Sequence, residues 1–268
     1  FKDCVYYQPE NSKIFDDDYT LHEGTLKIFE LDTLTGFYHH SFQFFEEKDK
    51  SYLSFINEEN RYLYIYDYST GKSLKKINLK KEGPDGVGNT KLMGHFVHTL
   101  DSIFIYSYYV ATIFLIDSAG KVLNKKKLFD NDNNEISQAY PTIRTEMPAF
   151  IKNRKLYIMG RPPAQSLVDH TTITNVIEID IDSFIIRKLF HGPLIYNCAN
   201  WGFDMKYRLQ GWYNNISNKF IYSFGADPFV HETDHVNYSK KHFLGSKYFD
   251  GVEPFHKNRY AIIGEDFP

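Results

Sequence analysis

One hairpin pattern recurs along this chain and constrains its fold more than any other feature. Residues 61–79 read RYLYIYDYSTGKSLKKINL: an apolar strand, an aspartate, a short polar turn and a second strand. The same order returns at residues 113–128 and 176–190, and an earlier copy lies at residues 26–42. Asp and Gly favour such turns, because Asp hydrogen-bonds its own turn and Gly tolerates positive φ. We therefore predict an antiparallel hairpin at each place.

Further strand pairs accompany these hairpins. They are predicted for residues 52–56 with 62–66, 96–99 with 103–107, 149–151 with 155–159, and 209–213 with 219–224. The combined unit has about four short strands and returns roughly every 50 to 60 residues, a pattern typical of β-propeller blades. Segments with the period of an amphipathic helix are nearly absent.

These repeats predict an all-β fold. We expect residues 1–268 to form a single β-propeller domain of about four to six antiparallel, four-stranded blades, incomplete at its C-terminal end. The alternative is a β-sandwich, whose strands can have similar spacing. The 23 Phe and 21 Tyr residues suit half-buried pleated surfaces and so support a β fold.

Charge and cysteine content exclude several classes of protein. The net charge is −3 and the pI is about 6.4, so the basic field that drives nucleic-acid binding is missing. No apolar run approaches the ~20 residues that a membrane-spanning helix needs. Cys4 and Cys198 are too few for a disulfide framework or a zinc knuckle, and we expect free or buried thiols.

The glycine-rich stretch KKEGPDGVGN has the composition of a phosphate-binding loop but lacks its context. Such a loop needs a Lys-Ser/Thr pair after its last glycine and then a helix, whereas Asn89, Thr90 and a strand follow here. We interpret it as a structural crossover near the propeller axis, formed by Gly83, Pro84, Gly86 and Gly88. Val87 is then expected to pack between blades.

Residues 231–235 read HETDH, which matches the H-E-x-x-H zinc motif. The motif requires a helix, but the segment is poor in helix formers and follows a strand. On a strand His231 and His235 would lie ~13 Å apart, too far for one metal ion. We therefore predict no metal site and no cofactor here; Ca²⁺ remains possible without a supporting motif.

Six residues are candidates for contacting a ligand. Arg161, Asp169 and His170 lie in the longest insertion between strands, residues 160–172. Trp201 and Trp212 could stack on a sugar or peptide, although tryptophans also serve as core residues. His231 completes the set. No catalytic residues are identified, and Asp117, Asp180 and Asp182 are interpreted as turn formers.

The segments YIYDYSTGKSLKKINLKKEGPDGVG, VHTLDSIFIYS and LIDSAGKVLNKKKL resemble the DUF4221 family of Bacteroidetes. The resemblance is specific over residues 50–130 and continues more weakly through NNISNKFIYSFGAD and SKYFDG. It implies a six-bladed propeller and an exported protein, periplasmic or anchored to the outer membrane by a lipid attached upstream. The family implies no catalytic residues, and Cys4 lacks the surroundings of a lipidated cysteine.

Two functions remain open at this point. The first is a non-catalytic binding module that holds a small molecule, glycan or peptide at the funnel face of the propeller. The second is a propeller-type hydrolase or lyase with an axial polar or Ca²⁺ site. Three or more polar side chains converging on the axis would favour the enzyme, whereas an aromatic-lined channel would favour binding.

Overall fold

The structure is a computed structural model that describes residues 22, 24–35, 39, 41–88, 92–108, 110–128, 139–161, 169–202, 204–244 and 254. The first sheet contains β1 (Phe42–Glu47), β2 (Lys50–Asn57), β3 (Tyr62–Asp67) and β4 (Ser73–Asn78). The second contains β5 (Leu92–Thr99), β6 (Ser102–Ser107), β7 (Thr112–Ile116) and β8 (Val122–Lys127).

The third sheet contains β10 (Phe150–Lys152), β11 (Lys155–Arg161), β12 (Thr174–Asp180) and β13 (Ile186–His191), with the short β9 (Tyr140–Pro141) paired to β11. The fourth contains β14 (Leu209–Asn214), β15 (Lys219–Phe224), β16 (Phe229–Thr233) and β17 (Ser239–Phe243). Two short 3₁₀ helices, η1 (Leu194–Asn197) and η2 (Asp204–Tyr207), connect the third and fourth sheets.

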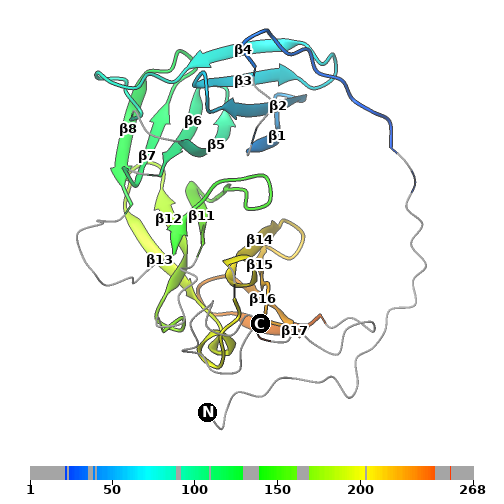
Figure 1. Cartoon of the computed structure of the whole chain (residues 1–268), viewed down its shortest axis with the longest axis vertical. Helices are drawn as coiled ribbons and strands as arrows, with labels where there is room; N and C mark the ends of the chain where they lie inside the picture. The colour runs from blue at the N-terminus through cyan, green and yellow to red at the C-terminus, as the bar shows by residue number, and fades with distance from the viewer. Residues whose placement is uncertain are drawn as a thin grey trace, which may run out of the picture.

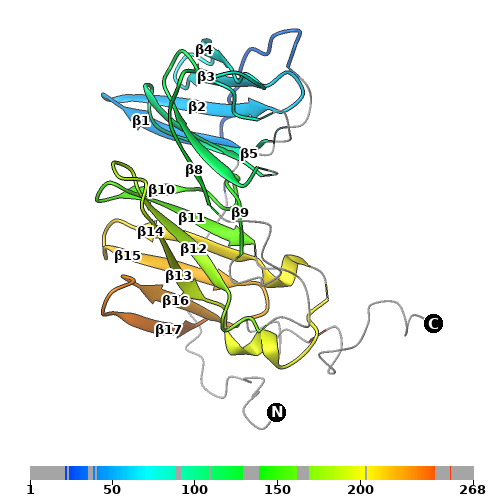
Figure 2. The same ribbon diagram turned by 90° about the vertical axis from the view of Figure 1, so that its left-hand side faces the viewer.

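The strands of each sheet are antiparallel and follow chain order, and the four sheets succeed one another around an arc (Figures 1 and 2). The first strand of each sheet lies toward the inside of the arc and the fourth lies outside, where β8 has almost only exposed residues. The prediction of an all-β fold with four-stranded antiparallel sheets is therefore confirmed.

An aspartate at the end of the third strand forms the turn to the fourth strand in every sheet. Asp67, Asp117, Asp180 and Asp234 each accept hydrogen bonds from backbone N–H groups two to four residues later. These bonds satisfy turn donors that the sheet leaves unpaired. The recurring aspartate of the sequence is thus a turn-forming residue, and Asp234 adds a fourth copy that the repeat analysis did not include.

Three apolar cores lie between successive sheets. Leu63 and Ile65 of β3 pack with Ile103 and Ile105 of β6 between the first and second sheets. Equivalent cores join the second sheet to the third and the third to the fourth. Alternation along β3 places Tyr64 and Tyr66 on the other face, so this strand contributes to both sides of its sheet.

The glycine-rich stretch connects β4 to β5. Gly83 and Gly88 have positive φ, and a Cβ on Gly86 would lie 2.7 Å from the backbone carbon of Glu82. Val87 is 1% exposed and belongs to the core between the first two sheets. The Asp85 carboxylate accepts a hydrogen bond from the N–H of Val122 in β8. The connection therefore passes the outermost strand of the second sheet, which corrects the expected path near the axis.

Two strand predictions need correction. The hairpin expected at residues 26–42 does not form, because residues 24–35 contain no strand and residues 42–47 form β1, the innermost strand of the first sheet. The hairpin of β16 and β17 was missed, since the HETDH motif obscured a strand followed by an aspartate turn.

Cys198 is disulfide-bonded, which corrects the expectation of free thiols. Cys4 lies outside the described residues. In the part of the chain that the structure covers, no helix has the length and apolar character needed to cross a bilayer.

Candidate functional site

Residues 169–172, the described end of the insertion after β11, lie beside η1 and include two of the predicted site residues. Asp169 accepts a hydrogen bond from the Asn197 side-chain amide at 2.5 Å, and the amide oxygen of Asn197 accepts the N–H of His170 at 2.9 Å. The imidazole of His170 lies against the rings of Tyr196 and Tyr207, at centroid distances of 5.3 and 5.0 Å. His170 is 1% exposed and Asp169 is exposed, so only Asp169 can meet a ligand without rearrangement.

Trp201 belongs to the same region but serves its core. Its side chain is fully buried, and its indole N–H donates to the carbonyl oxygen of Ile195 at 2.9 Å. Its backbone N–H donates to the hydroxyl of Tyr207 at 3.1 Å. Trp201 therefore positions η1 and η2 rather than offering a stacking surface.

Arg161 and Trp212 are both exposed and belong to different sheets. Arg161 ends β11 and pairs with Tyr140 of β9, at the end of the sheet that carries the insertion. Trp212 is 64% exposed in the middle of β14. Gly211 next to it lies against Met159 of the third sheet, so alternation turns Trp212 toward the opposite face.

The HETDH residues each have a different partner. His231 lies on β16 and is 5% exposed, with Nε2 at 2.7 Å from the Asp227 carboxylate. Glu232, on the other face, accepts hydrogen bonds from the Tyr238 hydroxyl and from His242. His235 follows the strand and contacts the hydroxyl of Tyr222, and burial lowers its pKa to about 4. His231 and Glu232 therefore lie on a strand and His235 lies after it, whereas the zinc motif requires all three on one helix.

A short hairpin that the sequence analysis did not single out links all four sheets. Residues 142–149, here called the bridging hairpin, are closed by reciprocal backbone hydrogen bonds between Arg144 and Met147. They follow Pro141, and Pro148 lies within them. The hairpin connects β9 to β10 and therefore originates in the third sheet.

Each sheet contacts the bridging hairpin at one point. The Thr145 hydroxyl accepts the N–H of Phe42 in β1 at 2.8 Å. Ile143 lies so close to Gly94 of β5 that a Cβ there would be 1.8 Å from the Ile143 carbonyl oxygen. In the third sheet, the Thr142 N–H donates to a carbonyl of β11. Toward the fourth sheet, Met147 belongs to the same apolar core as Leu209 of β14.

These contacts define one end of the sheets, which we call the loop end. There β1, β5 and β14 begin and β11 ends. The insertion with Asp169 and His170 leaves β11 at this same end, so the bridging hairpin and the predicted loop residues share one region. Met147 connects the bridging hairpin to this region, because it is 2% exposed and packs in the core that contains Trp201 and Tyr207.

The tip of the bridging hairpin carries three charged side chains. Oε1 of Glu146 lies 3.8 Å from Nη1 of Arg144 and 3.9 Å from Nη1 of Arg208. The side chains are 43% exposed for Glu146, 26% for Arg144 and 22% for Arg208. Two half-buried guanidinium groups therefore converge on one accessible carboxylate, an arrangement suited to binding an anionic group.

A sequence signal for this hairpin exists. Residues 140–149, YPTIRTEMPA, separate two predicted strands, and the charged tip lies between two prolines. Proline limits strand pairing, so a charged segment between two prolines indicates a projecting turn. The sequence does not show that this turn lies beside Arg208, which comes more than 60 residues later in the chain.

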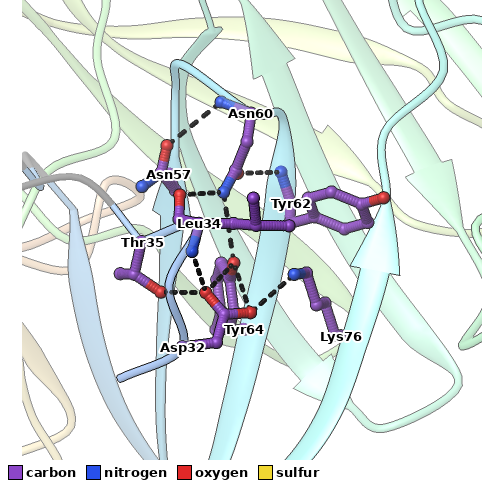
Figure 3. Close-up of polar contacts among 8 residues, drawn as sticks. All are labelled: Asp32, Leu34, Thr35, Asn57, Asn60, Tyr62, Tyr64 and Lys76. Atoms are coloured by element: carbon purple, nitrogen blue, oxygen red, sulfur yellow. Dashed lines mark hydrogen bonds and ion pairs between the residues drawn. The ribbon is translucent and has the colours of Figure 1, made fainter.

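A second polar cluster lies on the first sheet and is shown in Figure 3. Residues 24–35, here called the strap, lie against the tyrosine face of β3, and Phe29 packs against Tyr66. Asp32 accepts hydrogen bonds from Lys76 at 2.6 Å, from the Thr35 hydroxyl at 2.7 Å and from the N–H of Leu34 at 3.0 Å (Figure 3). The Lys76 ammonium group holds the pKa of Asp32 well below its usual value.

The Asp32 cluster fastens the strap and leaves little capacity for a ligand. The Tyr64 hydroxyl donates to Asp32, with both carboxylate oxygens at 3.2 Å, so the oxygens are saturated. Among the described residues, no group of three or more His, Cys, Asp or Glu side chains is arranged to hold a metal ion. The tip of the bridging hairpin is therefore the better candidate for a ligand site.

Several solved structures are similar to this chain, and one of them supports the fold. A member of the DUF4221 family from Bacteroides vulgatus superposes with a TM-score of 0.69 at 19% identity, covering 87% of this chain and 66% of that one. A catalytically inactive virginiamycin B lyase from Staphylococcus aureus, solved with quinupristin, gives a TM-score of 0.49 at 12% identity, covering 83% of this chain and 60% of the lyase.

A protein of unknown function from Bacteroides caccae gives a TM-score of 0.43 at 11% identity, covering 76% of this chain and 67% of that one. The chain thus spans about two thirds of the length of the DUF4221 structure. No curated protein matches the sequence. The family model described as a domain of unknown function, DUF4221, matches residues 18–258, and this chain belongs to that family.

Proposed function

We propose that this chain is an exported binding module whose ligand site lies at the loop end of a β-propeller. The observation that carries the proposal is the bridging hairpin, which contacts all four sheets and places Arg144, Glu146 and Arg208 together. A site supported by several sheets is rigid, so little conformational entropy is lost on binding. Loops from successive blades commonly form such sites in propellers.

The finer architecture belongs to the same proposal. The four sheets are consecutive blades of a propeller, and a six-bladed ring is the arrangement that the family resemblance implies. The exposed Trp212 on the fourth sheet and exposed Phe44 on the first suit faces that pack against further blades. The ligand is a small molecule, a glycan fragment or a peptide.

Export is supported by the disulfide at Cys198, because disulfides persist in oxidising compartments such as the periplasm. A lipid anchor upstream of this segment would hold the module at a membrane surface. Cell fractionation, with the free thiol content of the protein detected under denaturing conditions in each fraction, tests this part. A fully reduced Cys198 in that protein would contradict it.

The site is tested by hydrogen exchange in the presence of candidate ligands. We expect a bound ligand to protect the amides of residues 142–149 and 204–209 from exchange. Exchange in the four aspartate turns between the third and fourth strands should stay unchanged. Protection restricted to those turns, or to the strap, would contradict the placement. The double variant Arg144→Ala/Arg208→Ala is the matched protein that should lose the protection.

A second candidate function uses the same residues. Glu146 is a partly exposed carboxylate between two arginines, which is a possible general base beside groups that stabilise an oxyanion. The hydrolase or lyase alternative calls for polar side chains within hydrogen-bond reach of one another on the axis, whereas the distances here are 3.8 and 3.9 Å. Glu146→Gln separates the two functions, since a lyase would lose turnover while a binding module would keep its ligand.

A further inference from the structure

The turn between β16 and β17 inserts one side chain between the third and fourth sheets. The imidazole of His235 lies against the rings of Phe220 and Tyr222 in β15, at centroid distances of 4.6 and 5.5 Å. On the side of the third sheet, the rings of Tyr157 in β11 and Phe190 in β13 lie at 6.3 and 6.1 Å. One residue of a turn therefore packs against aromatic side chains of both sheets.

A hydrogen bond of this imidazole requires the neutral ring. Nε2 of His235 lies 2.9 Å from the hydroxyl of Tyr222, whose side chain is fully buried. Among the described residues, this hydroxyl has no other hydrogen-bond partner. A buried hydroxyl without an acceptor is costly, so we assign the hydroxyl as donor to Nε2 and place the ring proton on Nδ1. Once Nε2 carries a proton, the hydroxyl can only accept from it, and its own hydrogen is left without an acceptor.

The charges around His235 do not supply a counter-ion in contact with it. The charged and titratable side chains of the surrounding elements are Lys155 and Tyr157 of β11, Glu178 of β12, Arg187 of β13, Lys219 and Tyr222 of β15, and Asp234 and Tyr238 of the turn. Both acids already have a lysine partner at 3.0 Å. In the described part of the chain, no carboxylate lies at ion-pairing distance from His235. Burial lowers the pKa of His235 from 6.5 to about 4, and the charges of Glu178 and Asp234 offset this only in part.

His231 of β16, four residues earlier, has the opposite surroundings. Its ring also meets Phe190, at a centroid distance of 5.6 Å. However, its Nε2 lies 2.7 Å from the nearly buried carboxylate of Asp227. A proton on His231 would complete an ion pair, whereas a proton on His235 would disrupt a hydrogen bond. Acid therefore retains the first histidine in its place and disfavours the second.

We propose that His235 is an acid-released latch between the fourth sheet and the third. The neutral imidazole holds the end of the β16–β17 hairpin against Tyr157 and Phe190. The protonated imidazole leaves the aromatic rings for solvent, and this end of the hairpin separates from the third sheet. The path is short, because His235 is half-buried and the next residue, Val236, is 77% exposed. Release uncovers an aromatic surface that is accessible only in acid.

Amide hydrogen exchange measures the release. A pKa of about 4 in the docked ring and 6.5 in the released ring raises the opening equilibrium about 70-fold between pH 7.5 and pH 4.5. We expect the protection of residues 232–240 to fall by up to that factor, after correction for the intrinsic pH dependence of exchange. Residues 117–121 form the equivalent turn of the second sheet with Ser118 after the aspartate, and they should keep their protection.

Two variants without a titrating ring test the assignment. His235→Asn suits the backbone, because φ is +61° and asparagine tolerates this region. His235→Gln has an amide long enough to reach the Tyr222 hydroxyl. Both should show protection of residues 232–240 that no longer depends on pH, whatever its level at pH 7.5. His242→Gln is the matched control, because His242 belongs to the same hairpin but bonds to Glu232 on the other face, and it should respond like the wild type.

The wild-type protein supplies a further check that needs no folded variant. The ¹³C signal of the His235 imidazole, assigned by its absence in either variant, should titrate below about pH 5.5. A pH-dependent loss of protection in the wild type and in His242→Gln alone supports the latch. Constant protection in the wild type, an equal loss in both His235 variants, an equal loss at residues 117–121, or titration of His235 near pH 6.5 overturns it. None of these results bears on the ligand site at the loop end.

Discussion

The bridging hairpin and the strap are both irregular segments that lie against the sheets, yet they are held in opposite ways. The hairpin is fixed by apolar burial, with Met147 only 2% exposed, while its carboxylate at Glu146 is loosely paired. The strap leaves Ile28 82% exposed and Leu26 93% exposed, while its carboxylate at Asp32 is fully hydrogen-bonded.

This contrast indicates which charges are structural and which are free for function. Where apolar contacts fix a segment, its charged groups need not hold it in place and can serve a ligand. Where a segment has few buried contacts, its charged groups fasten it and have no remaining capacity. The following experiments test the contrast, beginning with the largest expected effect.

Gly94→Ala should disturb the contact between β5 and the bridging hairpin. The new Cβ would lie 1.8 Å from the Ile143 carbonyl oxygen, a backbone atom, and φ of +149° is unfavourable for alanine. We expect a loss of about 3 kcal/mol or more in the free energy of unfolding, measured with urea. Gly83→Ala is the control, because its φ is also positive but nothing lies near its Cβ position. It should cost only about 1 kcal/mol, and equal losses would contradict the close contact.

Met147→Ala tests the apolar anchor itself. Removing this buried side chain should lower the free energy of unfolding by about 2–3 kcal/mol, since the core beside Trp201 would contain a cavity. Leu34→Ala in the strap is the counterpart, and with 59% exposure it should change stability by less than about 0.5 kcal/mol. A large effect at Leu34 would show that the strap is anchored like the hairpin.

Acid should weaken β5, which contacts the bridging hairpin through Gly94, and the strap in different pH ranges. His95 of β5 is buried between the first two sheets, with Nε2 at 2.8 Å from the Ser54 hydroxyl, and burial lowers its pKa from 6.5 to about 3. As the pH falls, His95 is therefore protonated in the unfolded chain at a higher pH than in the folded chain. The free energy of unfolding decreases as the pH drops below 6.5. His95 alone should contribute a loss of about 2 kcal/mol between roughly pH 6 and pH 4.5, at about 1.4 kcal/mol per unit. His235, whose pKa burial also lowers, to about 4, adds its own loss in this window.

The strap responds only at lower pH. The pKa of Asp32 lies below its usual value near 3.8, so its contribution is present above that pH and is lost as the pH falls further. Urea unfolding as a function of pH, in the wild type and in His95→Gln, checks the assignment, because glutamine does not titrate. An unchanged slope between pH 6 and pH 4.5 in His95→Gln would show that another group is responsible.

Asp32→Asn should have the smallest global effect and a clear local one. Loss of the negative charge weakens the bond to Lys76, so amide exchange within residues 28–35 should accelerate while Tm stays nearly unchanged. Glu30→Gln, on the same strap, changes charge equally and should leave exchange as it was. Similar acceleration in both variants would mean that net charge, rather than the Asp32 hydrogen bonds, retains the strap.

The repeats made most of the fold predictable, because strand, aspartate and turn are local signals. Residues 62–66 and 103–107 were placed correctly for this reason. The first strand at residues 42–47 was missed, since the preceding Asp32 and Gly36 imitate the turn of a repeat. In fact Asp32 bonds to Lys76, which lies 44 residues later.

The candidate site was predictable only in part. Asp169 and His170 were found through the length of their insertion, and the structure brings them together with Asn197. Trp201 lies nearby but is buried, and burial depends on packing that no local pattern encodes. Arg144, Glu146 and Arg208 were missed, because their convergence depends on how the third and fourth sheets meet.

The bridging hairpin also bears on the order of folding. Each sheet is built from neighbouring strands and can form by local hairpin closure, which is fast. The bond between Phe42 and Thr145 joins residues 103 positions apart, so its formation carries a much larger loop-closure entropy. The hairpin can contact the first sheet only after the intervening second sheet has formed and packed. A nascent chain would therefore acquire the bond between the hairpin and the first sheet late, when the second sheet is already in place.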